Sequence, residues 1–168
     1  MPCLILPTLA VAHSVRAAAQ TYGEDLMPAY GSQVVDLADS ELQGYVEGLI
    51  ADAREETARP LGHVPSTHLW WVDGHEFLGR VHIRHRLTPF LLESGGHLGY
   101  HVVPPWRRLG HATAMLGAAL PIARAMAMDR LLITCDTTNV ASQKVIEANG
   151  GVLEDERGGK LRYWVPTG

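Results

Sequence analysis

The sequence predicts a single α/β (α+β) domain built on a mixed β-sheet, and three observations lead to this prediction. The chain has 168 residues, a length that suits one domain with its own hydrophobic core. Apolar runs with strand character alternate with segments of helical periodicity in the order β-α-α-β-β-β-α-β-α-β-β. The turn signal Asp73-Gly74 joins two of these runs into a hairpin, so the sheet contains antiparallel pairs and is not doubly wound.

The first half of the chain predicts one strand, two helices and the hairpin. The second helix begins at Asp39-Ser40-Glu41, a sequence suited to a helix N-cap. In the second hairpin strand, period-2 alternation places Val81 and Ile83 on one face. The predicted elements are a strand at 3–6, helices at 12–21 and 39–58, a loop at 22–38, and hairpin strands at 67–72 and 77–86.

The second half predicts two further strands, two helices and a last hairpin. Gly150-Gly151 marks the end of the last helix. Pro121 lies inside an otherwise helical pattern, which predicts a kink and not a domain boundary. The predicted elements are strands at 98–103 and 131–135, helices at 111–127 and 139–149, and a hairpin of residues 151–156 and 161–165.

Composition and charge exclude several classes of protein. The net charge is −4, so no overall positive field would attract nucleic acid, and an anion needs a local site. Cys3 and Cys135 are the only cysteines, as expected for free thiols in a reducing compartment. No apolar run approaches the roughly 20 residues that span a bilayer, and the N-terminal run lacks a basic region and is broken by Pro7. We therefore expect a cytoplasmic protein without a membrane partner.

Residues 99–113 form the segment with the clearest chemical meaning. A strand-like run ends at Pro104-Pro105, two arginines and a glycine follow, and a helix then begins. A helix N-terminus exposes unpaired N–H groups with partial positive charge. Gly110 lets a ligand approach the backbone, while Arg107 and Arg108 add charge. This combination predicts a cradle for a pyrophosphate group.

Other binding motifs are absent or weak. The chain has neither the GxxxxGK[ST] phosphate loop nor the GxGxxG dinucleotide fingerprint. His82 and His85 would point to opposite faces of one strand, so we expect no metal site. The basic row Arg80, His82, Arg84 and Arg86 is interpreted as a solvated strand face, with binding of an acidic substrate as the alternative.

The run Arg107-Arg108-Leu109-Gly110-His111-Ala112 resembles the acetyl-coenzyme A motif of the GNAT superfamily, [Q/R]-x-x-G-x-[G/A]. Downstream, Asn139, Ser142 and Gly150-Gly151 match a second family pattern in the helix after strand 131–135. Residues 95–100 and 145–151 are similar to a subgroup of predicted acetyltransferases of unsettled substrate. The resemblance implies a GNAT-type fold, a mixed and mostly antiparallel sheet with splayed central strands flanked by helices.

The resemblance also implies how acetyl-CoA binds as a co-substrate. Strand 98–103 would part from strand 131–135, and the pantetheine arm would pair with the exposed strand edge. Backbone N–H groups at the start of the next helix would hold the pyrophosphate. The implied binding residues are Val102, Val103, Arg107, Arg108, Leu109, Gly110, His111, Ala112, Thr113, Asn139 and Ser142.

The implied reaction is direct attack of an amine on the acetyl group in a ternary complex. An amine of the lysine type has a pKa near ~10, so a base must remove a proton. His101 is the preferred base because a histidine pKa suits neutral pH. Glu93 and His97 are the alternatives, since they also lie on or before the splayed strand.

The general acid departs from the family pattern. The usual tyrosine, four residues after the small residue of the last motif, is replaced by Ile146, which cannot donate a proton. Tyr163 and Tyr100 are the candidate replacements. The absence of the usual acid supports an alternative function, a non-catalytic acyl-CoA-binding or sensing module. A nucleotide-binding domain is a third hypothesis.

The acceptor is expected to be a primary amine of a small molecule or a protein. In the family the first two helices build the acceptor wall, which here assigns it to the loop 22–38, with Tyr22, Glu24 and Tyr30. Asp136, at the end of its strand, would bind a cationic acceptor or cap the turn. The resemblance is also compatible with a homodimer.

Overall fold

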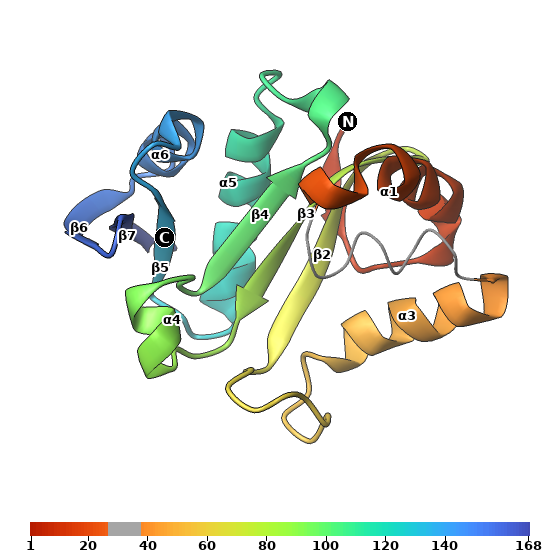
Figure 1. Ribbon diagram of the computed structural model, residues 1–168, viewed down its shortest axis with the longest axis horizontal. Helices are drawn as coiled ribbons and strands as arrows, with labels where there is room; N and C mark the ends of the chain where they lie inside the picture. Colours follow the sequence, from red (N-terminus) through yellow and green to blue (C-terminus); the bar gives the residue numbers. More distant parts are fainter. Residues whose placement is uncertain (27–37) are drawn as a thin grey trace.

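The computed structural model describes residues 1–26 and 38–168, which form two antiparallel sheets flanked by helices (Figure 1). In the larger sheet the strand order is β1-β2-β3-β4, and in the smaller sheet it is β5-β7-β6. The strands are β1 (Cys3–Ile5), β2 (Ser66–Asp73), β3 (Glu76–Arg84), β4 (Leu98–Val102), β5 (Arg130–Asp136), β6 (Val152–Arg157) and β7 (Lys160–Pro166).

The helices cover both faces of the larger sheet. Helices α1 (Ala12–Leu26) and α3 (Asp39–Ala51) pack on one face, where Trp70 and Val72 join their apolar cluster. Helix α5 (His111–Ala125) packs on the other face, against Val81 and Ile83. Helix α6 (Val140–Ala148) lies beside β5, and the short helix α4 (Pro89–Glu93) connects β3 to β4 (Figure 1).

The alternation predicted for β3 is confirmed, but one interpretation of its other face is wrong. Val81 and Ile83 are buried toward α5, whereas Arg80, His82 and Arg84 point to the face that α1 and α3 cover. These three basic side chains are partly buried and are not a solvated face. Arg84 donates to the carbonyls of Gly95 and Gly96, both at 3.0 Å.

Most predicted elements are present, with three local differences. The first helix continues to Leu26, beyond the predicted end at 21. The second ends at Ala51 and not at 58, because residues 52–57 turn back toward β2. Helix α4 was not predicted, because five residues are too few to show helical periodicity, although Thr88 and Pro89 supply an N-cap and a first residue. Helix α5 continues through Pro121, so that residue marks no boundary.

The central strands are splayed, as expected. Strands β4 and β5 lie side by side (Figure 1) but belong to different sheets. The backbone N–H of His97 donates to the carbonyl of Leu132 at 2.7 Å, next to the start of β4. The strands part beyond this point, toward Val102 and Asp136. None of the helices in the described ranges is long and apolar enough to cross a membrane.

Candidate active site

A cavity of about 710 Å³ opens between the parted ends of β4 and β5. We call it the strand-gap cavity. Its wall joins three elements that are distant in the sequence: β4, the start of α5, and the region from β5 into α6. The lining includes Gly99, Tyr100, His101, Val102, Trp106, Arg107, Arg108, Gly110, His111, Ala112, Thr113, Thr134, Cys135, Asp136, Asn139, Ser142, Val145 and Lys160.

The N-terminus of α5 forms one end of this cavity. Gly110 is the N-cap with φ +85°, and Arg108 also has a left-handed φ of 62°. The first backbone bond of the helix runs from the N–H of Ala114 to the carbonyl of Gly110. Within the described ranges no protein acceptor bonds the N–H groups of residues 111–113. These amides and the open space beside Gly110 fit the predicted anion cradle.

The two arginines of the cradle have different positions. Arg107 turns back over β4, where its Nε donates to the carbonyl of Val102 at 2.9 Å and its Nη2 lies 3.1 Å from Nε2 of His101. Arg108 is exposed at the mouth of the cavity. Arg108 is therefore the arginine that is placed to meet a bound anion from solvent.

The strand edge differs in part from the expectation. The N–H of Val103 donates to the carbonyl of Leu78 on β3 at 2.9 Å, so this amide cannot pair with a ligand in the gap. The carbonyl of Val102 is bonded by Arg107. Because Val103 faces β3, alternation along the strand directs the backbone groups of Tyr100 and Val102 toward the gap. We therefore assign the edge to Tyr100 and the N–H of Val102.

A polar cluster forms another part of the cavity wall. The hydroxyl of Tyr100 lies 2.6 Å from Oγ of Ser142. Burial raises the pKa of Tyr100 to about 12, so its hydroxyl stays protonated at neutral pH. Burial also raises the pKa of the neighbouring Cys135 thiol. Asn139 caps α6 as predicted, and its Oδ1 accepts the N–H of Ser142 at 3.1 Å.

Three of the residues predicted for catalysis, Glu93, His97 and Tyr163, lie outside the strand-gap cavity. Glu93, at the end of α4, pairs with Arg157 at 2.7 Å on the surface. Tyr163 is buried in β7 and its hydroxyl donates to Glu147 at 3.2 Å. Only His101 is both a predicted base and part of the cavity wall, and its Nε2 lies against Arg107.

The residues predicted for the acceptor are not gathered in one place. Asp136 lies at the rim of the strand-gap cavity and pairs with Lys160. Tyr22 lies in α1, where its ring packs on the apolar cluster beneath that helix. The backbone of Glu24 belongs to α1, and Tyr30 falls outside the described residues.

Sequence reasoning missed one residue that positions the cradle. Nε1 of Trp71 in β2 donates to Nδ1 of His111 at 3.2 Å, which anchors the first residue of α5 to the larger sheet. The two residues are 40 positions apart, and no local pattern links them.

In the part of the chain that the structure describes, no group of three His, Cys, Asp or Glu side chains is arranged to hold a metal.

Comparison with known proteins places the chain among enzymes that use coenzyme A. A family model described as an acetyltransferase (GNAT) domain matches residues 8–152. RimJ of Mycobacterium smegmatis, solved with CoA-disulfide, aligns with a TM-score of 0.69 and 19% identity over 97% of this chain and 80% of that one. No curated protein matches the chain in sequence.

Two further solved structures share the fold. The microcin C7 self-immunity acetyltransferase MccE, in complex with acetyl-CoA and AMP, aligns with a TM-score of 0.67 and 16% identity over 98% of this chain and 92% of that one. A ribosomal-protein-S5-alanine acetyltransferase of Vibrio fischeri aligns with a TM-score of 0.65 and 15% identity over 98% and 92%. At these identities the three structures establish similarity of fold.

Proposed function

The chain belongs to the GNAT acetyltransferase family and is an acyl-CoA-dependent N-acetyltransferase, and we propose that it binds acetyl-CoA in the strand-gap cavity and acetylates a primary amine. One observation supports this placement above the others. The unbonded N–H groups of residues 111–113 open onto the same cavity as the free edge of β4. A pyrophosphate and an extended amide-containing arm need these two features side by side.

The residues of the cavity divide the task of binding. The amides at the start of α5 and the guanidinium of Arg108 stabilise the phosphate charges. Arg107 holds the end of β4 through the carbonyl of Val102 and supports the cradle from beneath. Asn139 uses its Oδ1 to cap α6, which leaves its amide nitrogen available to the arm. Bound acetyl-CoA supplies the activated acetyl group.

Tyr100 is the best-placed general acid on the wall of the cavity. Its hydroxyl is protonated, lies in the gap and is oriented by Ser142. It can therefore give a proton to the departing sulfur and recover one from solvent. Ile146, at the family's usual tyrosine position, is fully buried in the core. The proton donor thus comes from β4 in place of α6.

The proposal is tested by calorimetric titration of CoA into variants of the cradle. Gly110→Trp fills the open space, and Arg108→Glu reverses the charge at its mouth. Both variants should lose measurable CoA binding and keep the circular dichroism of the folded protein. The unfolding midpoint of Arg108→Glu should stay near wild type, whereas that of Gly110→Trp should fall because a side chain at φ +85° is strained. Arg124→Glu is the matched control, since it changes the same charge at the other end of α5. Wild-type CoA affinity in both cradle variants would refute this placement.

The rival function, a CoA-binding module without catalysis, is separated from the enzyme by turnover. Release of free thiol from acetyl-CoA should depend on an added amine and should yield the N-acetyl product by mass spectrometry. Tight CoA binding without transfer to any amine in a broad panel would favour the module. Protection of the fold by ATP and not by CoA would favour a nucleotide-binding domain.

A further inference from the structure

A second cavity, of about 890 Å³, lies on the other side of β4 from α5. We call it the histidine cavity. Polar side chains from β2 and β3 form its floor, and two connecting segments form its rim. The residues used below are Asp52, His68, His82, Arg84, Leu61 and Phe90. Of the predicted catalytic and acceptor residues that the structure describes, none lines it.

The two cavities approach each other at Gly99. Gly99 lines the strand-gap cavity, and its partner across the sheet is His82 of β3. A Cβ atom placed on Gly99 would lie 2.6 Å from Cε1 and 3.1 Å from Nε2 of His82. The imidazole thus occupies the space that a side chain would fill, and it packs against the β4 backbone at a residue that lines the strand-gap cavity.

His82 is uncharged at neutral pH and can accept a proton from a strongly acidic donor, such as an amine nitrogen that has bonded to the acetyl carbon. Burial lowers its pKa well below the usual value, and Arg84, His68 and Arg80 act in the same direction, so the ring is neutral at neutral pH. Within the described residues no hydrogen bond occupies either ring nitrogen. His101 differs, since its Nε2 faces the guanidinium of Arg107 at 3.1 Å.

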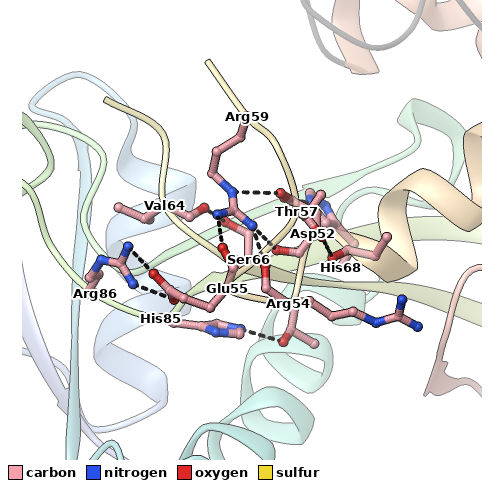
Figure 2. Close-up of polar contacts among 12 residues, drawn as sticks. Asp52, Arg54, Glu55, Thr57, Arg59, Val64, Ser66, His68, His85 and Arg86 are labelled. Carbon is pink, nitrogen blue, oxygen red and sulfur yellow. Dashed lines mark hydrogen bonds and ion pairs between the residues drawn. The ribbon is translucent and has the colours of Figure 1, made fainter. Parts of the chain in front are cut away.

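A carboxylate lies behind His82, on the far side of the His68 ring. The His82 ring stacks on His68 at a centroid distance of 5.8 Å. Nε2 of His68 lies 2.9 Å from Oδ2 of Asp52 (Figure 2). Arg59 holds the segment after α3 in place by bonding the carbonyls of Asp52, Arg54 and Glu55 (Figure 2). The Asp52 carboxylate is therefore fixed in position before a ligand enters.

The rim indicates the kind of molecule that fits. Leu61 is fully exposed and the side chain of Phe90 is 72% exposed, yet both line the same cavity. Val64 and Leu91 add buried apolar surface beneath them. Apolar groups at a concave site favour a ligand with apolar surface of its own. The volume is in the range of cavities that bind small molecules.

We propose that the histidine cavity binds the acceptor, a small primary amine with an apolar or aromatic group, and that His82 is the base that takes its proton. This inference rests on the proposed acetyl transfer. The acceptor reacts as the neutral amine, R–NH₂, after its ammonium form has lost one proton to solvent. The electron pair of the nitrogen forms the C–N bond to the acetyl carbon as the C–S bond breaks. His82 takes the second proton, which becomes acidic once the nitrogen carries the acetyl group, and Tyr100 gives a proton to the sulfur.

The role of His82 is tested with acetyl-CoA and phenethylamine. His82→Gln should lower kcat about 100-fold or more, with the Kd for CoA unchanged. His82→Asn is the second variant, in case the longer amide disturbs the sheet. His85→Gln is the control, because His85 bonds Thr67 outside the cavity and should keep wild-type kcat. Added imidazole should restore part of the rate to His82→Gly and not to wild type. A His82 variant that binds CoA, stays folded and keeps more than half the wild-type kcat overturns this role.

The acceptor class is tested at the rim. Phe90→Ser and Leu61→Ser should each raise KM for phenethylamine about 10-fold and leave kcat and CoA affinity unchanged. Leu153→Ser removes another exposed leucine, on β6 and outside the cavity, and is the control. Ethanolamine, spermidine and a lysine peptide should be poorer acceptors than phenethylamine. Preference for any of them with unchanged KM in the rim variants overturns the acceptor assignment. If the wild-type protein does not bind CoA at all, the result refutes the proposed function itself and not only the acceptor assignment.

Discussion

The ring Nδ1 of His97 accepts the backbone N–H of Leu132 at 2.9 Å. With the opposite bond, from the N–H of His97 to the carbonyl of Leu132, it joins the start of β4 to β5, although the two strands belong to separate sheets. Nearby, the N–H of Gly95 donates to Oγ1 of Thr134 at 2.9 Å. These contacts close the narrow end of the gap, so the width of the strand-gap cavity depends on a neutral histidine.

Stability at acidic pH should therefore depend on His97. Burial, assisted by Arg84, lowers its pKa from 6.5 to about 4. Between these values the unfolded chain binds more protons than the folded one, so the free energy of unfolding falls as the pH falls from about 6.5 toward 4. In His97→Asn the amide oxygen can still accept the Leu132 N–H without titrating. Urea unfolding of this variant should show a weaker dependence on pH than wild type.

Other histidines contribute to the wild-type slope, since the pKa values of His68, His82 and His85 are also lowered, mainly by burial. The informative quantity is the difference between the wild-type and His97→Asn curves. If the free energy of unfolding falls in parallel for both proteins from pH 7 to pH 4, protonation of His97 does not contribute to the loss of stability.

The ion pairs of Arg162 should contribute more to stability than those of the exposed arginines. Its guanidinium is almost fully buried and lies 2.6 Å from Asp155 and 2.9 Å from Glu154, while Nε donates to the carbonyl of Leu92. Arg162→Met leaves the carbonyl of Leu92 without its donor and removes the partner of two partly exposed carboxylates, and we expect a loss of about 1–3 kcal/mol. Urea unfolding of purified variants measures this loss.

Arg157→Met is the matched control, because Arg157 pairs with Asp155 and Glu93 on the surface. Exposed pairs of this kind contribute about 0–1 kcal/mol. Similar losses in both variants would mean that burial of Arg162 does not determine its contribution.

Tyr100→Phe should lower the rate of transfer without weakening CoA binding. The variant keeps the ring in the wall of the cavity and removes only the hydroxyl that meets Ser142. We expect kcat to fall about 100-fold, as measured by thiol release at saturating acetyl-CoA and amine. Tyr163→Phe is the comparison, because that hydroxyl bonds Glu147 and does not line the cavity. A larger loss of kcat in Tyr163→Phe would reverse the assignment of the acid.

CoA should protect Cys135 from alkylation. Cys135 lines the strand-gap cavity beside Ser142, whereas Cys3 is exposed at the N-terminus. In a Cys3→Ser background, a small thiol reagent should modify Cys135 slowly, since burial raises the pKa of the thiol. Saturating CoA should slow the modification further, as followed by mass spectrometry. An unchanged rate with bound CoA would place the ligand elsewhere.

Much of the fold followed from local patterns. The Asp73-Gly74 turn and the alternation of Val81 and Ile83 predicted β2 and β3, and both strands are present. Helix α5 begins after Gly110 as predicted. Helix α4 was missed, since a single turn leaves no periodic pattern, and the end of α3 was placed late, because residues 52–57 continue with helix-forming residues.

The site was predictable only in part. The helix start, the glycine and Arg108 are contiguous, so their meeting was visible in the sequence. The direction of Arg107 was not, because its partners Val102 and His101 depend on how the loop turns back over β4. Tyr100 was one of two candidate acids, and only its contact with Ser142, 42 residues away, favours it.

The sequence by itself determined which segments become strands and helices and where an anion cradle begins, because these properties depend on neighbours within a few residues. Tertiary structure decided which side chains meet at the two cavities. The pairing of His82 with Gly99 and the stacking of His82 on His68 follow from strand register. Register is set by the whole buried face of a sheet, so a glycine that leaves room for an imidazole can be recognised only after the chain has folded.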